Sequence, residues 1–460
     1  MKRKKILVTL LHPFTPRAVL YTGLLQKLMM EGHEITILVP EEKYSFYAKS
    51  SFSRGLIFKT LKILEYNINF SNQIMTFFEY AIHTNIKKFH AREMYVRDMK
   101  KTTYFMRRIC INTIGKSRML QFLLRACFSK IMSAVPTGVE HYLTKDVDIL
   151  FSTDIYNVHD LLFIESARRK KIKVIGMVRS WDNNVSKFLL PLTPDHIVTQ
   201  NEIQKNELKS VQGVTSTIIT SIGIPYYEYY TQYTPTPRNI FMSSLGIPTE
   251  SKLILFSPAG GKFIDHDWQF CQIIKDAIEC GDLPNNTYVL VRCHPGNPCD
   301  LTSFQPNEHF IIERPGTIVD SVRGNKGAEL DIDATNHLID ELTHSDVVIN
   351  ILSSIVLDAA VVETPVITPQ FEGFSKNVPF LKSVQRFQEE ENMAMLLNIW
   401  NGSRPKTKTA FIEEIKRILQ GDIAPDTLAL KRIVDNYNIS PETKNELSST
   451  QSLHNILSKD

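Results

Sequence analysis

The sequence predicts an α/β protein built from two doubly wound domains, the first of which carries a helical insertion. Short apolar segments of strand length alternate with amphipathic segments of helix length in both halves of the chain. The apolar segments contain few polar residues, which is typical of parallel strands covered by helices on both faces. The chain also has 460 residues, too many for one ordinary domain.

The first half of the chain begins with a strand, a helix and a second strand. We expect the first strand at residues 5–10, one continuous helix over 17–30 that ends at Gly32, and the second strand at 34–39. The same alternation predicts later strands at 147–151, 173–178, 196–199 and 218–221, with helices over 158–170 and 202–210. These elements predict a first domain over residues 1–230.

The second half repeats this alternation after a change in composition. Residues 231–238 contain two prolines and no apolar periodicity, as expected of a linker. Beyond them, strands are expected at 252–256, 287–292 and 346–351, with another beginning at 365. We therefore expect a second domain over residues 239–385 and a helical tail over 386–460.

One segment of the first half is basic and helical instead. Residues 71–132 show helical periodicity, and the part from 87 to 130 holds twelve Lys or Arg against two acidic residues, a local net charge of +10. Five aromatic residues lie among the charges: Tyr95, Tyr104, Phe105, Phe122 and Phe128. This composition is typical of helices in a membrane interface, and we expect the segment to hold the protein on an anionic membrane surface. A solvated helix pair whose aromatic residues pack on the first domain is the alternative, and no nucleic-acid module is visible.

Composition limits the classes of protein that this chain can represent. The net charge of +4 is small for its length, so overall charge gives no indication of nucleic-acid binding. Six cysteines without a C-x-x-C pair or zinc-type spacing indicate free thiols in a reduced, cytoplasmic protein. The apolar run at residues 6–11 is too short for a signal peptide, and no run approaches the ~20 apolar residues of a membrane span, so we expect any membrane contact to be peripheral.

Three strand ends in the second half carry residues suited to an anionic ligand, and ligands bind at the carboxyl ends of such strands. Ser353 and Ser354 begin a helix, where backbone N–H groups favour a phosphate, and Asp358 lies one turn further on, where it can accept from ribose hydroxyls. The alternative is that Ser353 only caps this helix and that Asp358 is solvated.

The other two strand ends carry a histidine and a glycine pair. His294 precedes a proline and can donate to a diphosphate, or it is a satisfied loop histidine. Gly260 and Gly261 allow a phosphate to approach the backbone, and Lys262 supplies charge, although the spacing is not that of a Walker loop. A turn with an exposed lysine is the alternative there.

The order of these residues resembles a known family. His-Pro followed by DVVINILSSIVLDAAVVETPVI is similar to the C-terminal half of bacterial CDP-glycerol glycerophosphotransferases and of related capsule and surface-polysaccharide glycosyltransferases. The segment SWDNNVSKFLLPLTPDHIVTQNEIQKNEL resembles the N-terminal domain of such enzymes. The resemblance covers roughly residues 1–40 and 145–370. Ile351 and Leu352 stand where the family usually has aspartate and tyrosine, which leaves the donor open.

The resemblance implies a GT-B fold, with two Rossmann-like domains facing a cleft, and no metal or other cofactor. It places donor phosphates at His294, Ser353 and Ser354, and ribose at Asp358. The implied function is transfer of a sugar from a CMP-, CDP- or UDP-linked donor to a carbohydrate or lipid-linked acceptor during the synthesis of cell-envelope polysaccharide, including capsule. Polyol-phosphate transfer, a UDP-sugar 2-epimerase and an inactive scaffold are the alternatives.

The first domain is expected to bind the acceptor and to supply a catalytic base. The candidates are His12, at the end of the first strand, Asp154 and Asp182, although both aspartates can equally be turn residues. Arg179 is a candidate for binding an anionic group of either substrate. Three D-x-D triplets, at 146–148, 265–267 and 331–333, do not end strands as a metal site of that kind needs, so we expect no metal there.

Overall fold

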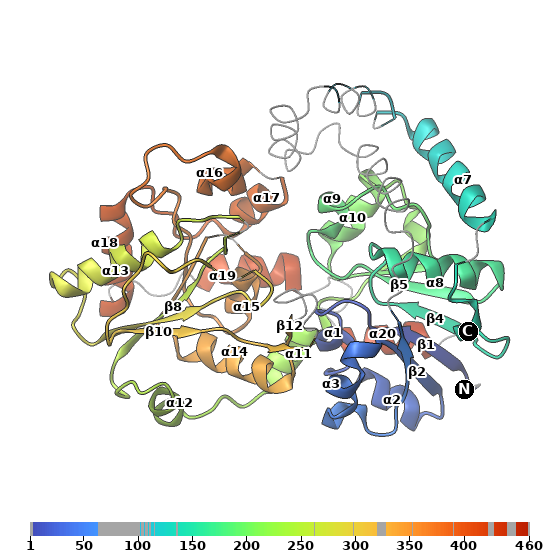
Figure 1. Ribbon diagram of the computed structural model, residues 1–460, viewed down its shortest axis with the longest axis horizontal. Helices are drawn as coiled ribbons and strands as arrows, with labels where there is room; N and C mark the ends of the chain where they lie inside the picture. The colour runs from blue at the N-terminus through green and yellow to red at the C-terminus, as the bar shows by residue number, and fades with distance from the viewer. Residues whose placement is uncertain are drawn as a thin grey trace. The chain divides into compact units, whose positions relative to one another are not determined.

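The computed structural model describes most of the chain (Figure 1). The described residues are 3–62, 102, 105, 109, 112–114, 116–134, 137–261, 263–297, 299–319, 328–351, 353–389, 391–421, 427–438 and 448–458. They divide into two compact units, Met1–Glu228 with Asn436–Asp460, and Tyr229–Asp435. The domain boundaries predicted at residues 230, 239 and 385 stay predictions.

The first unit contains a parallel sheet with the order β3-β2-β1-β4-β5-β6-β7 in the described part of the chain. Its strands are β1 (Lys5–Thr9), β2 (Glu34–Pro40), β3 (Ile57–Leu61), β4 (Ile149–Ser152), β5 (Lys173–Met177), β6 (His196–Thr199) and β7 (Ile219–Ser221). Ile6 pairs with Ile35 on one side and Ile149 on the other. All three side chains are buried, so the apolar sequence of β1 reflects burial on both faces.

Helices connect these strands. They are α1 (Pro16–Val19), α2 (Leu24–Met30), α3 (Tyr44–Ala48), α7 (Arg118–Ala134), α8 (Val158–Arg169), α9 (Asn183–Ser186) and α10 (Glu202–Ser210), and α11 (Pro225–Gln232) spans the boundary between the units. The single helix expected over residues 17–30 is wrong. Gly23 lies between α1 and α2 with φ of +74°, a left-handed conformation that interrupts the helix at little cost for glycine.

Helix α7 corrects part of the expectation for the basic segment. Phe128 is buried in the apolar core of the first unit, not exposed among the charges. Arg125 donates from Nε to the Leu190 carbonyl at 2.9 Å and from Nη2 to the Gln212 carbonyl. The remaining aromatic residues divide: Phe105 and Phe122 are exposed, whereas Tyr95 and Tyr104 lie outside the described residues. No helix among the described residues is long and apolar enough to cross a membrane.

The end of the chain returns to the first unit. Helix α20 (Ser449–Ser458) packs against α2. His454 Nε2 lies 2.8 Å from Glu31 Oε2, and Lys4 Nζ donates to the Ser458 carbonyl at 3.1 Å. The first unit is therefore built from both ends of the sequence.

The second unit contains a parallel sheet with the order β10-β9-β8-β13-β14 among the described residues. Its strands are β8 (Lys252–Ser257), β9 (Thr287–Arg292), β10 (Phe310–Glu313), β13 (Val347–Asn350) and β14 (Val366–Ile367), with a separate pair β11 (Thr317–Ile318) and β12 (Ala328–Glu329). The two doubly wound α/β sheets that the sequence predicts are thus confirmed.

The helices of the second unit are α12 (Arg238–Ser244), α13 (Trp268–Glu279), α14 (Ile332–His344), α15 (Ile355–Val361), α16 (Val384–Glu389), α17 (Glu391–Trp400), α18 (Lys408–Gln420) and α19 (Thr427–Ile433). The segment expected to be a linker is fixed to α14. The Thr236 backbone N–H donates to Asp340 Oδ1 at 2.9 Å, and the Thr236 hydroxyl donates to Oδ2 at 2.7 Å. This segment therefore lies between α11 and α12, and hydrogen bonds from Thr236 attach it to α14.

Candidate functional site

The carboxyl edge of the second sheet is held together by the side chain of Asn350. The strand order reverses between β8 and β13, which is where ligands bind in open α/β sheets. Asn350, the last residue of β13, is fully buried. Its Nδ2 donates to the Ser257 carbonyl at 2.9 Å and to Ser353 Oγ at 3.1 Å, and its Oδ1 accepts from the Ser353 backbone N–H at 2.5 Å. Asn350 thus joins the end of β8 to the turn that begins α15.

The two serines of this turn face different surroundings. Ser353 is half-buried, and its Oγ accepts from Asn350 and, at 3.5 Å, from the Ile355 backbone N–H. In every hydrogen bond described for it, this oxygen accepts, so its O–H proton remains available to donate. Ser354 is exposed and makes no side-chain capping bond to α15. Both hydroxyls therefore suit an anionic ligand, and their role stays a prediction.

Asp358 has a protein partner. Its Oδ1 accepts from the Tyr230 hydroxyl at 2.9 Å, and both residues are buried. One of its oxygens is therefore already engaged by α11, so contact with a ribose would have to use the other oxygen or displace Tyr230. The ribose-binding role stays a prediction.

The turn after β8 packs against the turn after β9. Gly260 has φ of +84°, and a Cβ there would lie 2.1 Å from the Asn297 carbonyl oxygen, so this position requires glycine. Asn297 Nδ2 donates to the Ala259 carbonyl at 3.0 Å. Asp267 accepts from the Gly260 backbone N–H at 2.8 Å, and this bond stabilises the turn. Gly261 follows in the same turn, and Lys262 lies outside the described residues.

His294 lies in the second of these turns. Its Nδ1 accepts from the Gly296 backbone N–H at 3.0 Å, which leaves the proton of a neutral ring on Nε2. Desolvation and the positive charge of Arg292 lower the pKa of His294, so the ring is neutral at neutral pH. The residue is exposed. The structure thus brings His294, Gly260 and Ser353 to one edge of the sheet.

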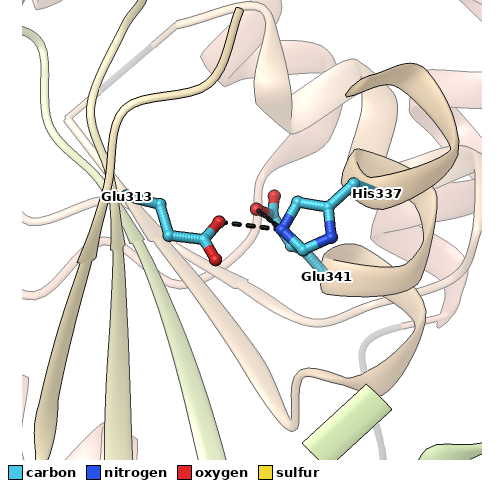
Figure 2. Close-up of side chains that lie close together, drawn as sticks. All are labelled: Glu313, His337 and Glu341. Carbon is cyan, nitrogen blue, oxygen red and sulfur yellow. Dashed lines mark hydrogen bonds and ion pairs between the residues drawn. The ribbon is translucent and has the colours of Figure 1, made fainter. Parts of the chain in front are cut away.

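Beside this edge lies a network of four ionisable side chains: Arg292 and the three drawn in Figure 2, Glu313, His337 and Glu341. Arg292 Nη1 lies 2.6 Å from both carboxylate oxygens of Glu341, and both residues are buried. His337 Nε2 lies 2.8 Å from Glu313 Oε2 and 3.2 Å from Glu341 Oε1. Figure 2 shows the ring on α14 pointing between the two carboxylates.

The three side chains in Figure 2 lie close enough to hold a metal ion. Hydrogen bonding to Glu313, opposed by desolvation, raises the pKa of His337, and burial raises that of Glu341 to about 7. Arg292 and a protonated His337 therefore already place two positive charges beside these two carboxyl groups. A divalent ion would face the Arg292 guanidinium, so the residues present fit a proton better than a metal.

The carboxyl edge of the first sheet contains a buried acid that the sequence analysis missed. Here the strand order reverses between β1 and β4. Asp160, in the first turn of α8, is fully buried; its Oδ1 accepts from the Thr9 hydroxyl and, at 2.9 Å, from the Ser152 hydroxyl. Its Oδ2 is buried without a hydrogen-bond partner among the described residues. Burial raises the pKa of Asp160 to about 7, and the nearby charge of Asp154 adds to this shift.

The predicted residues His12 and Asp154 also lie at this edge, together with Arg179. Arg179 Nε lies 2.7 Å from Asp154 Oδ2, and both side chains are largely buried. His12 Nδ1 accepts from the Phe14 backbone N–H at 3.3 Å, so a neutral ring carries its proton on Nε2. Desolvation, followed by the charges of Arg179, Lys187 and Lys43, lowers the pKa of His12 to about 2. In this arrangement His12 is a hydrogen-bond donor.

Asp182 lies in the turn that begins α9, where its Oδ1 accepts from the Ser180 hydroxyl at 2.7 Å. The aspartates of the D-x-D triplets make local contacts. Asp148 accepts from the Lys5 backbone N–H at 2.8 Å, Asp267 holds the Gly260 turn, and Asp331 caps α14. The catalytic roles assigned to His12, Asp154 and Asp182 stay predictions.

No model of a known protein family matches the chain, and no curated protein matches it in sequence. Solved structures do match over nearly the whole length. UDP-GlcNAc 2-epimerase from Neisseria meningitidis, bound to UDP-GlcNAc, is 12% identical, with a TM-score of 0.53 over 99% of this chain and 100% of that one. Arabidopsis thaliana UGT89C1, complexed with quercetin, is 12% identical, with a TM-score of 0.51 over 99% of this chain and 98% of that one.

A third match, an S. aureus MnaA–UDP structure, is 10% identical, with a TM-score of 0.50 over 99% of this chain and 96% of that one. The chain therefore has the GT-B fold that glycosyltransferases share with UDP-GlcNAc 2-epimerases. At this identity the similarity establishes the fold alone.

Proposed function

We propose that this protein is a glycosyltransferase that moves a sugar from a nucleotide-activated donor to a carbohydrate or lipid-linked acceptor. The observation that carries this proposal is the Asn350 bridge at the point of strand reversal. It holds the Ser353 turn beside the end of β8, where hydroxyl and backbone donors converge on one edge of the sheet. Such an edge favours an anionic ligand such as a nucleoside diphosphate.

In this proposal the second unit binds the donor. Ser353, Ser354, His294 and the backbone of the Gly260 turn contact the phosphates, and Lys262 adds positive charge. Preorganised donors of this kind stabilise the charge that develops on a departing nucleotide. The neutral His294 ring supplies a fixed N–H at the pH of the reaction, because its other nitrogen already accepts from Gly296.

The first unit binds the acceptor in this proposal. Because His12 presents an N–H and is surrounded by positive charge, it suits an anionic or hydroxyl oxygen of the acceptor better than the role of base. The base would then be Asp154 or Asp182. Of these, Asp154 is held by Arg179 in an ion pair, which must loosen if Asp154 is to accept a proton.

The decisive experiment identifies the nucleotide that the protein releases. Purified protein is incubated with CMP-, CDP- and UDP-linked sugars or with CDP-glycerol, each with candidate acceptors, and the released nucleotides and the products are quantified. Release of a nucleotide with equimolar glycosylation supports the proposal. Release of CMP from CDP-glycerol with transfer of glycerol phosphate would instead identify a polyol-phosphate transferase.

A 2-epimerase is the second candidate, favoured by the matches to UDP-GlcNAc 2-epimerases. An epimerase would convert UDP-GlcNAc without any acceptor, so the same incubation distinguishes it. Conversion of the sugar at C2 in the absence of acceptor would contradict the transferase. Nucleotide binding without any turnover would leave the scaffold alternative.

We further propose that α7 brings the protein to an anionic membrane surface that carries a lipid-linked acceptor. Met119, Phe122 and Leu123 are exposed on one face of this helix, and its sequence contains no acidic residue. Liposome sedimentation with and without anionic lipid tests this. Phe122→Ser removes an exposed aromatic side chain and should weaken binding, whereas Arg125→Lys, which keeps the positive charge of an inward-facing residue, is the control. Equal binding to neutral and anionic vesicles, or no binding, would contradict it.

A further inference from the structure

Two cysteines enclose the turn that carries His294. Cys293 is the residue after β9, and Cys299 lies six residues further along the chain. Their Sγ atoms are 3.1 Å apart, and both side chains are buried, with exposed fractions of 1% and 5%. A disulfide has an S–S distance of about 2.05 Å, so the two sulfurs need to approach by only about 1 Å.

We infer that Cys293 and Cys299 form an oxidisable thiol pair, whose conversion to a disulfide closes the His294 turn and reshapes the edge of the second sheet. The sequence alone indicated only free thiols, because a spacing of five intervening residues is neither a C-x-x-C pair nor a zinc pattern. The proximity arises from the turn, in which the Asn297 backbone N–H donates to the His294 carbonyl at 3.2 Å.

A small neutral oxidant such as hydrogen peroxide suits these buried thiols. A hydrogen bond from Cys299 lowers the pKa of Cys293, so Cys293 is the attacking thiolate. Its sulfur takes one oxygen of the peroxide, forming a sulfenic acid and releasing water after protonation. The Cys299 thiol then attacks that sulfur: the S–S bond forms as the S–O bond breaks, and the Cys299 proton leaves with the hydroxide as a second water. The pair loses two electrons, and the peroxide is reduced to two waters.

Formation of the disulfide would displace the neighbouring turn, which contains Gly260. Asn297 lies between the two cysteines, donates to the Ala259 carbonyl and packs so closely on Gly260 that no Cβ fits there. A shift of about 1 Å in the Cys293–Cys299 segment therefore moves the Gly260 backbone or breaks this bond. The effect on nucleotide binding rests on the proposed function, whereas formation of the disulfide does not.

The test uses the full-length protein, treated with graded hydrogen peroxide and then alkylated under denaturing conditions. We expect peptide mapping to show a 293–299 crosslink that dithiothreitol reverses, and loss of two titratable thiols. Cys293→Ser and Cys299→Ser each abolish that crosslink, whereas Cys280→Ser, which removes an exposed thiol elsewhere, retains it. Independent alkylation of Cys293 and Cys299 at every peroxide dose, or a crosslink of either to the buried Cys271, would overturn the inference.

The consequence for binding is measured separately by titrating UDP and CDP into reduced and oxidised protein. We expect affinity to fall by about tenfold on oxidation and to recover on reduction. Unchanged affinity after complete crosslinking would overturn the coupling to the edge. If the crosslink forms but the reduced protein binds no nucleotide, the proposed function fails and the thiol pair stands.

Discussion

The carboxyl edges of the two sheets contain the same histidine–proline turn and differ in the residues that surround it. In each unit a histidine follows a strand, a proline follows the histidine, and Nδ1 accepts the backbone N–H two residues on, from Phe14 for His12 and from Gly296 for His294. In each unit an arginine near the histidine pairs with a buried carboxylate. A neutral ring in either position therefore carries its proton on Nε2.

The difference lies in the burial of charge. The first edge holds His12, Asp154 and the fully buried Asp160 close together, and their environments shift the pKa of His12 down and that of Asp160 up. The second edge presents hydroxyl, amide and backbone donors, with its ionisable network set to one side. Fixed neutral donors suit binding of a phosphate, whereas perturbed acids and bases suit proton transfer. This comparison supports the proposal that the second edge binds the donor and that the first edge carries the acceptor chemistry.

The largest expected effect comes from breaking the arginine pair of the second edge. Arg292→Met removes the buried guanidinium from Glu341 and leaves only His337 beside that carboxylate, which costs about 3–5 kcal/mol of stability. Burial raises the pKa of Glu341 to about 7 while Arg292 lowers it, so the carboxyl of the variant holds its proton more tightly than that of wild type. Protonation relieves the loss, and unfolding by denaturant should therefore show a larger deficit at pH 8 than at pH 6. Arg292→Met with Glu341→Gln should recover most of it. Equal deficits at both pH values would show that Glu341 carries no charge in the folded protein.

Asp160→Asn tests the buried acid of the first edge. The pKa of Asp160 is raised in the folded state, from 3.8 to about 7, so the folded form holds its proton more tightly and stability falls as pH rises from about 4 to about 7. The variant should remove this fall, making the protein more stable than wild type at pH 8 by up to about 4 kcal/mol. Asp148→Asn, at an exposed strand end, is the matched control. A wild-type stability that is flat over this pH range would contradict the assignment.

The two histidines should differ in which substrate they affect. His294→Ala should lower turnover by about 10²–10³, by analogy with loss of a preorganised anion donor, with little change in melting temperature. His294→Gln, which can still donate, should recover part of the loss. His12→Ala should raise the KM for acceptor and leave nucleotide affinity unchanged. Loss of nucleotide affinity in His12→Ala would break the division between the two edges.

Ser353→Ala combined with Ser354→Ala should have the smallest effect on stability. Neither serine makes a strong cap to α15, and Asn350 Nδ2 still donates to the Ser257 carbonyl when its bond to Ser353 Oγ is lost. The double variant should therefore lose only about 1 kcal/mol of unfolding free energy. Thermal unfolding monitored by circular dichroism measures this. A loss several times larger would mean that the serines serve the fold of the second unit.

The sequence predicted most of the repeating elements because strands that are buried on both faces of a sheet consist almost entirely of apolar residues. The runs that contain Val8, Leu150, Leu255, Val291 and Ile349 all became strands. Breaks were harder to predict: Gly23 interrupts a helix that the apolar periodicity continues through. The exposed strand β3 lacks a continuous apolar run and was missed.

Residues of the candidate site could be predicted only where a residue suited to binding an anion directly follows a strand in the sequence. His294 and Ser353 were found in this way. Asp160 has the sequence context of an ordinary polar residue in the first turn of a helix, and its hydrogen-bond partner Thr9 is 151 positions away. The partners Arg292 and Glu341 are likewise 49 positions apart. Only tertiary packing brings such groups together, so a single sequence could not reveal them.

The binding of donor phosphates by the second unit is tested by the nucleotide affinity of the serine variant. Isothermal titration of UDP, CDP and CMP is carried out on wild type, on Ser353→Ala with Ser354→Ala, and on His12→Ala as a control in the other unit. We expect wild type and His12→Ala to bind one of these nucleotides equally and the serine variant to bind it at least about tenfold more weakly, with its fold retained. Wild-type affinity in the serine variant would contradict the assignment of the donor phosphates to the second unit.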